Sequence, residues 1–97
     1  MNADGSRAPG ARRTVTIVNA RGLHARAAAR FVELARQFTA TITVTREDVT
    51  VSGLSIMGLM MFAAGPGSVL EIAADGPDAA AAVDALATLV EAKFHES

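Results

Sequence analysis

The chain has 97 residues, with 9 basic and 10 acidic side chains and a formal net charge of −1, which suits one domain folded around a single core. It contains no cysteine, which excludes disulfide frameworks, thiolate zinc sites and cysteine nucleophiles. The near-zero net charge argues against general nucleic-acid binding, and no apolar stretch reaches the roughly 18 residues of a membrane-spanning helix.

The charge is unevenly distributed along the chain. Residues 1–36 carry seven arginines against two acidic residues, a net +5, whereas residues 37–97 carry two basic against eight acidic residues, a net −6. Such an uneven distribution of charge favours docking to partners of complementary charge. Part of the positive end, however, belongs only to the N-terminal segment, which holds Arg7, Arg12 and Arg13.

Residues 1–12 are rich in small and turn-forming residues and show no periodicity, which predicts a disordered leader before a domain that spans residues 13–97. The leader lacks the apolar core of a signal peptide, so the cytoplasm is the expected location.

Seven segments then show strand or helix patterns, in the order βαββαβα. The strands are expected at residues 14–19, 39–45, 49–52 and 68–73, and the helices at residues 25–37, 55–62 and 77–94. Each helix has one apolar face and the strands alternate. We therefore expect an α+β fold, in which an antiparallel sheet carries all its helices on one face and exposes the other to solvent.

The two later helices carry more detailed expectations. Ser55 suits the N-cap of the short helix, and Pro77 suits the first position of the last one. The last helix has an apolar stripe made of Val83, Leu86, Ala87, Val90 and Phe94. In the short helix, we expect Ile56, Leu59 and either Phe62 or Ala63 in the core, which leaves Met57, Met60 and Met61 partly exposed.

The segment from Asn19 to Arg26 lies where the first strand ends and the first helix begins. The first amide groups of a helix have no intrahelical partners, and the helix dipole is positive there, so this end favours an anion. His24 would place a nucleophilic imidazole at this end, Arg26 would add a guanidinium, and Gly22 would permit a sharp turn. The arrangement suits a transient phosphohistidine, although spacing alone rather favours an ordinary helix start with a solvated arginine.

Two motifs resemble the HPr family, the histidine-containing phosphocarriers of the phosphotransferase system. Gly22-Leu23-His24-Ala25-Arg26, followed by alanines and Phe31-Val32, resembles the family's active-site segment. Residues 53–61 resemble its regulatory-serine segment, in a Ser-Ile-Met-Gly form similar to the nitrogen-related branch. The resemblance covers about residues 13 to 94.

The resemblance implies an open-faced β-sandwich of four antiparallel strands with three helices on one side. It implies that His24 accepts phosphate from enzyme I phosphohistidine, on Nδ1, and passes it to a IIA-type protein, while Arg26 steadies the phosphoryl group. The protein would be a monomeric stoichiometric carrier and not an enzyme, with no cofactor, serving sugar uptake or nitrogen and carbon regulation. The family usually has proline after this arginine, and Ala27 instead leaves an extra free amide, which bears on the phosphohistidine lifetime.

Ser55 has two interpretations. As a plain N-cap it would stabilise the short helix by about 1 kcal/mol. As a regulatory phosphosite for an HPr kinase/phosphorylase, the function that the resemblance implies, it would gain a charge of about −1.5 to −2.

The exposed methionines predict an adaptable docking patch for enzyme I and the acceptor, inside a rim of arginines. The expected docking residues are Ala25, Ala29, Arg30, Arg36, Ile56, Met57, Met60 and Met61. The alternative is a loosely packed core edge, because methionine fills gaps. His95 is expected to be a solvated residue without a role, and no metal-ligand spacing is present.

Two other functions are alternatives to a phosphocarrier. A purely regulatory HPr-like interaction module would act through phosphoserine, but the pairing of His24 with Arg26 argues against it. A small α/β ligand-binding domain has no support from a glycine-rich phosphate loop or an acid pair.

Overall fold

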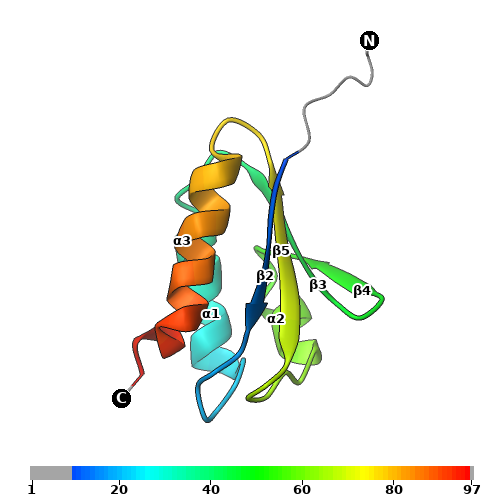
Figure 1. Cartoon of the computed structure of the whole chain (residues 1–97), viewed down its shortest axis with the longest axis vertical. Helices are drawn as coiled ribbons and strands as arrows, with labels where there is room; N and C mark the ends of the chain where they lie inside the picture. The colour runs from blue at the N-terminus through cyan, green and yellow to red at the C-terminus, as the bar shows by residue number, and fades with distance from the viewer. Residues whose placement is uncertain (1–9, 97) are drawn as a thin grey trace.

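The computed structural model describes residues 10–96, and four of its strands form one antiparallel sheet in the order β2-β5-β3-β4 (Figure 1). The strands are β2 (Ala11–Thr16), β3 (Thr41–Arg46), β4 (Val49–Ser52) and β5 (Val69–Asp75). The helices are α1 (Ala25–Ala35), α2 (Ile56–Met61) and α3 (Ala79–Glu91), and a single turn η1 (Lys93–His95) follows the last one.

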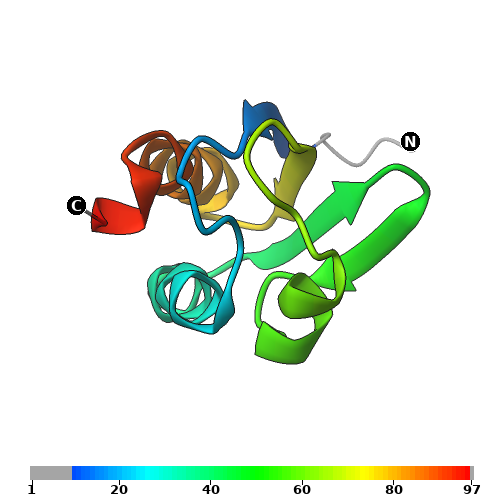
Figure 2. The same ribbon diagram turned by 90° about the horizontal axis from the view of Figure 1, so that it is seen from below.

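The helices cover one face of the twisted sheet and leave the other open (Figure 2). The register places Val15 opposite Leu70 and Val44 opposite Ile72, and all four side chains are buried beneath the helices. The alternating residues on the open face include exposed Thr14 and half-buried threonines of β3. The α+β open-faced sandwich predicted from the sequence is confirmed.

The first strand begins earlier than its alternating pattern predicts. β2 starts at Ala11, which pairs with Ala74, and Arg12 forms an ion pair of 3.3 Å with Glu71 on the neighbouring strand. Pairing with β5, which is remote in the sequence, therefore orders Ala11 and Arg12, two residues that the sequence pattern places in the leader. Of that leader, residues 1–9 lie outside the described residues.

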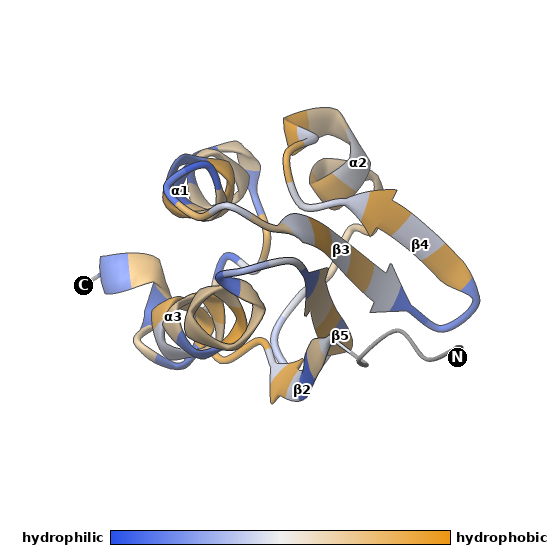
Figure 3. Ribbon diagram, turned by 90° about the horizontal axis from the view of Figure 1, so that it is seen from above, coloured by the Kyte–Doolittle hydropathy of each residue, from blue (hydrophilic) through white to orange (hydrophobic). Residues whose placement is uncertain are grey.

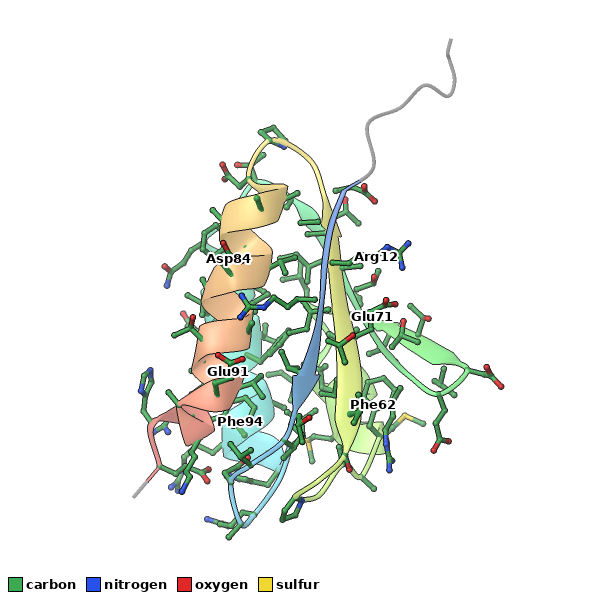
Figure 4. All side chains as sticks on the ribbon, viewed as in Figure 1. Arg12, Phe62, Glu71, Asp84, Glu91 and Phe94 are labelled. Carbon is green, nitrogen blue, oxygen red and sulfur yellow. The ribbon has the colours of Figure 1, made fainter. Side chains whose placement is uncertain are left out.

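Both ends of α3 differ from the sequence expectation. The N-cap is Asp78, so Pro77 precedes the helix and does not occupy its first position. The reason is a tertiary contact, because Asp78 Oδ2 accepts a 2.7 Å hydrogen bond from the backbone N–H of Thr39. At the other end, α3 stops at Glu91, and Phe94 reaches the core from η1 and not from the helical stripe (Figure 4).

The short helix α2 confirms its predicted N-cap, since Ser55 Oγ accepts a 2.9 Å hydrogen bond from the N–H of Gly58. Leu59 and Phe62 are buried as expected, but Ile56 is 39% exposed, so its predicted core position is wrong. Ile56 lies about 120° around the helix from Phe62. Only one face of this short helix packs against the core, so the Ile56 side chain stays partly exposed.

The three methionines of α2 are exposed as predicted, Met57 by 70%, Met60 by 39% and Met61 by 80%. Figure 3 shows the apolar character of α2 and of β4, against which it packs.

Candidate functional site

The loop between β2 and α1 is held against the segment that follows α2. The N–H of Leu23 donates a 2.8 Å hydrogen bond to the carbonyl of Ala64, and the Leu23 side chain is buried. Gly22 has φ +64°, and a Cβ there would lie 2.2 Å from the Ala64 oxygen. Only glycine therefore allows the loop to approach this closely while turning into α1.

His24 is the N-cap of α1, with an extended backbone of φ −74° and ψ 178°. Its carbonyl accepts the first helical hydrogen bond, 2.8 Å from the N–H of Ala28. The amides of residues 25–27 consequently lack intrahelical partners, and they form the positive end of the helix dipole beside the imidazole. This end has no acidic residue in its first turn, so it suits an anion brought from outside.

The C-terminal turn folds onto the same end of the molecule (Figures 1 and 2). Lys93, Phe94 and His95 all have positive φ, at 59°, 55° and 61°, a left-handed conformation that costs roughly 1–2 kcal/mol for each residue with a side chain. The Phe94 side chain is fully buried, and its carbonyl accepts a hydrogen bond from Arg30 Nη1. These contacts hold the strained turn in place.

Glu96, which follows the turn, reaches the imidazole directly. Its Oε2 contacts His24 Nε2, and its Oε1 accepts a 3.0 Å hydrogen bond from Asn19 Nδ2. The side chains of His24 and Glu96 are only 16% and 17% exposed. The hydrogen bonds from His24 first and Asn19 second lower the pKa of the Glu96 carboxyl, with a smaller effect of the Arg21 charge, and together they outweigh the opposing effect of burial.

Asn19 fixes the orientation of this carboxylate. It is 2% exposed, and its Nδ2 also donates a 2.8 Å hydrogen bond to the carbonyl of Gly22. Because that carbonyl can only accept, the amide nitrogen and not the oxygen must face it. The nitrogen therefore also faces Glu96, while Asn19 Oδ1 is buried without a hydrogen-bond partner.

A cation-rich pocket of about 400 Å³ opens next to Glu96. Its lining residues are Asn19, Ala20, Arg21, Arg26, Arg30, Lys93, His95 and Glu96. Within residues 10–96, Arg26 forms no ion pair. A site with this excess of positive charge suits a phosphoryl group or an acidic partner side chain.

A second, apolar hollow of about 270 Å³ touches His24 on another side, and Met60 and Arg21 help to line it. The imidazole is thus flanked by an apolar hollow and, through Glu96, by the cation-rich pocket. The structure brings together four of the residues singled out in the sequence, namely His24, Arg26, Arg30 and Met60.

Other predicted docking residues lie apart from the imidazole. Arg36 is the C-cap of α1, at the far end of a helix about 16 Å long. Met61 lines a different hollow, together with Arg46 and Val49. Closer to the site, Ala25 is exposed and Ala29 half-buried on α1.

Sequence reasoning missed Asn19 and Glu96 as parts of the site. A polar residue between a strand and Gly22 could have singled out Asn19, but no local pattern links Glu96 to a histidine 72 residues away. His95 is exposed as expected, but it also helps to line the cation-rich pocket.

Residues 10–96 contain neither a candidate membrane span nor a candidate metal site. No helix there is long and apolar enough to cross a bilayer, and no group of three or more histidine or acidic side chains could hold a metal ion. The expected cytoplasmic location and monomeric state remain predictions.

Comparison with known proteins identifies the family. Residues 11–92 match the family model for the phosphorylation site of the HPr component of the phosphotransferase system. The chain is 46% identical over 85 residues to phosphocarrier protein HPr of Neisseria meningitidis. The aligned region covers 88% of this chain and 96% of that protein. It is 45% identical to phosphocarrier protein NPr of Shewanella violacea, over 88% of this chain and 93% of that protein.

The fold agrees with these matches. The crystal structure of HPr-C-His from Thermoanaerobacter tengcongensis superimposes with a TM-score of 0.85 at 40% identity, over 90% of this chain and 98% of that one. The same family is indicated by the open-faced sandwich, by the family model and by the similar proteins. The chain therefore belongs to the HPr family and is a phosphocarrier of the phosphotransferase system, not an enzyme.

Proposed function

We propose that this phosphocarrier receives its phosphoryl group on Nδ1 of His24, from the phosphohistidine of enzyme I, and passes it to a histidine of a IIA-type protein. The observation that carries the proposal is the position of His24 at the N-terminus of α1, with Nε2 already engaged by Glu96. Within residues 10–96, Nδ1 has no hydrogen-bond partner, so it is the ring nitrogen available for attack.

The transfer needs only one bond to form and one to break. The Nδ1 lone pair of His24 bonds to phosphorus while the phosphorus–nitrogen bond of the donor breaks, and the donor nitrogen keeps that electron pair. Onward transfer reverses these roles with the acceptor histidine. The free amides of residues 25–27 would then lie next to the phosphoryl oxygens, and Ala27 adds a donor that proline would lack.

Arg26 is proposed to stabilise the phosphorylated state. Its side chain lines the cation-rich pocket beside Arg21 and Arg30, and charge-assisted hydrogen bonds to a phosphoryl group contribute roughly 1.5–3 kcal/mol. Arg26→Ala should therefore slow transfer in at least one direction and change the rate of phosphohistidine hydrolysis. If both rates match those of the wild type, Arg26 has no part in the site.

The test of the acceptor uses enzyme I and phosphoenolpyruvate, with intact mass and acid lability as readouts. The wild type should gain one acid-labile phosphoryl group, and His24→Ala should gain none while keeping its fold. His95→Ala is the matched control, because it removes the other histidine and should still be labelled. Undiminished labelling of His24→Ala would refute the assignment.

We propose that partners dock on the exposed apolar face of α2 and the adjacent start of α1. Met60 shares a hollow with His24, and Arg30 lies at the edge of the neighbouring cation-rich pocket. Added salt should weaken enzyme I binding chiefly through the association rate, because charges at the rim steer the encounter. Chemical-shift mapping that placed the partner on the open face of the sheet would contradict this surface.

Ser55 is proposed as a regulatory phosphosite on the same surface. It caps α2, the helix that carries the exposed methionines, so a phosphate there would add negative charge where the partner docks. The modifying partner would be an HPr kinase/phosphorylase.

A further inference from the structure

Glu96 is the one carboxylate that contacts His24 within residues 10–96. It lies outside residues 11–92, the part of the chain that the family model covers. Its two oxygens have separate partners, His24 Nε2 and Asn19 Nδ2. This arrangement gives the carboxylate a defined orientation toward a single ring nitrogen.

We propose that Glu96 is a positioning residue that holds neutral His24 with its proton on Nε2, which leaves the lone pair on Nδ1. A carboxylate can only accept hydrogen bonds, so the ring nitrogen that faces it must be the one that carries the proton. A neutral imidazole has one protonated nitrogen and one lone pair, and the hydrogen bond made by one nitrogen decides the state of the other. This inference rests on His24 being the phosphoryl acceptor.

The hydrogen-bond chain that reaches His24 presents an acceptor to its Nε2. The Gly22 carbonyl requires a donor, so Asn19 presents Nδ2 to it and, with the same nitrogen, to Glu96. Glu96 therefore accepts at both oxygens, and its lowered pKa keeps it an acceptor. The backbone of the active-site loop thus determines, through Asn19 and Glu96, where the imidazole proton lies.

This tautomer suits the phosphoryl transfer proposed above. With the proton on Nε2, Nδ1 attacks phosphorus without first losing a proton, and the donor nitrogen leaves with its electron pair. The imidazole ring becomes positively charged as the bond forms, and the Glu96 carboxylate lies against that charge. Serine hydrolases use a carboxylate in the same way, to set the tautomer of their histidine and to stabilise the imidazolium.

The backbone of the C-terminal turn supports a functional role for this contact. Three successive residues with side chains have positive φ between Ala92 and Glu96, and such strain persists only where the surroundings hold it. The buried Phe94 and the hydrogen bond from Arg30 to its carbonyl hold the turn. Its result is that Glu96 reaches His24 and Asn19.

Two substitutions at Glu96 separate tautomer control from simple packing. In Glu96→Gln, the amide oxygen must still face the donor Asn19, so the new NH₂ group faces His24 Nε2 and donates to it. That contact favours the wrong tautomer, with the proton on Nδ1. Glu96→Ala only removes the hydrogen-bond acceptor of His24 Nε2, so that water solvates this ring nitrogen instead. The conservative glutamine should therefore be the more harmful change, which is the reverse of what packing predicts.

The experiment measures the His24 tautomer by ¹⁵N NMR, at a pH where the imidazole is neutral, and the labelling rate with enzyme I and phosphoenolpyruvate. The wild type should show a protonated Nε2 and an unprotonated Nδ1, and Glu96→Gln should shift the ring toward the opposite form. Labelling of Glu96→Gln should fall by about 10–100-fold, by analogy with the loss seen when the hydrogen-bond partner that orients a metal-binding histidine is changed, and that of Glu96→Ala should fall less. Glu91→Gln, which removes the same charge from α3, should keep the wild-type rate.

Failure of this inference differs from failure of the proposed function. A protonated Nδ1 in the wild type, or a Glu96→Gln variant labelled as fast as the wild type, would overturn the role of Glu96 and leave His24 as the acceptor. A Glu96→Ala variant that is labelled faster than the wild type, or more slowly than Glu96→Gln, would also overturn it. Labelling that persists in His24→Ala would refute the acceptor itself, whatever the tautomer.

Discussion

Glycine at position 93 should stabilise this protein, although glycine usually destabilises a chain. Lys93 directly follows the C-cap of α3 and has φ 59°, the position and conformation in which helices most often have glycine. A side chain in this conformation costs roughly 1–2 kcal/mol, and glycine gives back about 0.4–1 kcal/mol through the greater entropy of its unfolded chain. The net gain is about 0.5–1 kcal/mol.

The comparison that isolates this backbone effect is Lys93→Gly against Lys93→Ala, because both variants lack the lysine charge. The glycine variant should have the higher free energy of unfolding in denaturant, and a Tm higher by about 2–8 °C for a domain of this size. Ala92→Gly is the matched control. Its φ of −87° is ordinary, so glycine there should lower the stability by about 0.5–1 kcal/mol. A Lys93→Gly variant less stable than Lys93→Ala would refute the reasoning on backbone strain.

Further predictions concern Gly22 in the loop before α1, the exposed methionines of α2, Ser55 and the carboxyl of Glu96. Gly22→Ala should lower the free energy of unfolding by more than about 2 kcal/mol, measured in denaturant, because it adds left-handed strain to a Cβ placed 2.2 Å from a carbonyl oxygen; Gly65→Ala, whose Cβ meets nothing within 4 Å, is its control. Met60→Glu should weaken enzyme I binding in calorimetry at every salt concentration, and more than Met61→Glu does, because only Met60 shares a hollow with the imidazole. Phosphorylated Ser55 should slow labelling of His24 without unfolding α2, since a helix N-terminus tolerates an anion; equal labelling rates would leave Ser55 as an ordinary cap. The lowered pKa of Glu96 means that its contacts stabilise the fold fully above the ordinary value of 4.5 and are lost as the pH falls through the lower value of the folded state; a ¹³C titration of the Glu96 carboxyl with a midpoint at or above 4.5 would contradict this.

Local patterns in the sequence predicted most of the fold. The strand Val49–Ser52 and the capping serine at position 55 were confirmed to the residue, because the β-branched residues of a short strand and the cap of a helix act through their neighbours in the chain. Predictions failed where a remote segment supplied the partner. β5 extends β2 to Ala11, and Thr39 makes Asp78 the N-cap of α3.

The same distinction applies to the candidate site. The sequence alone placed His24 and Arg26 at the start of α1, because a strand, a glycine turn and a helical periodicity are all local. Only the tertiary structure showed that Glu96 reaches His24, since that contact spans 72 residues and depends on a turn whose positive φ angles no residue preference predicts. The proposed nucleophile and phosphate site are thus local in the sequence, whereas Glu96, the group proposed to decide which nitrogen attacks, lies 72 residues away from His24.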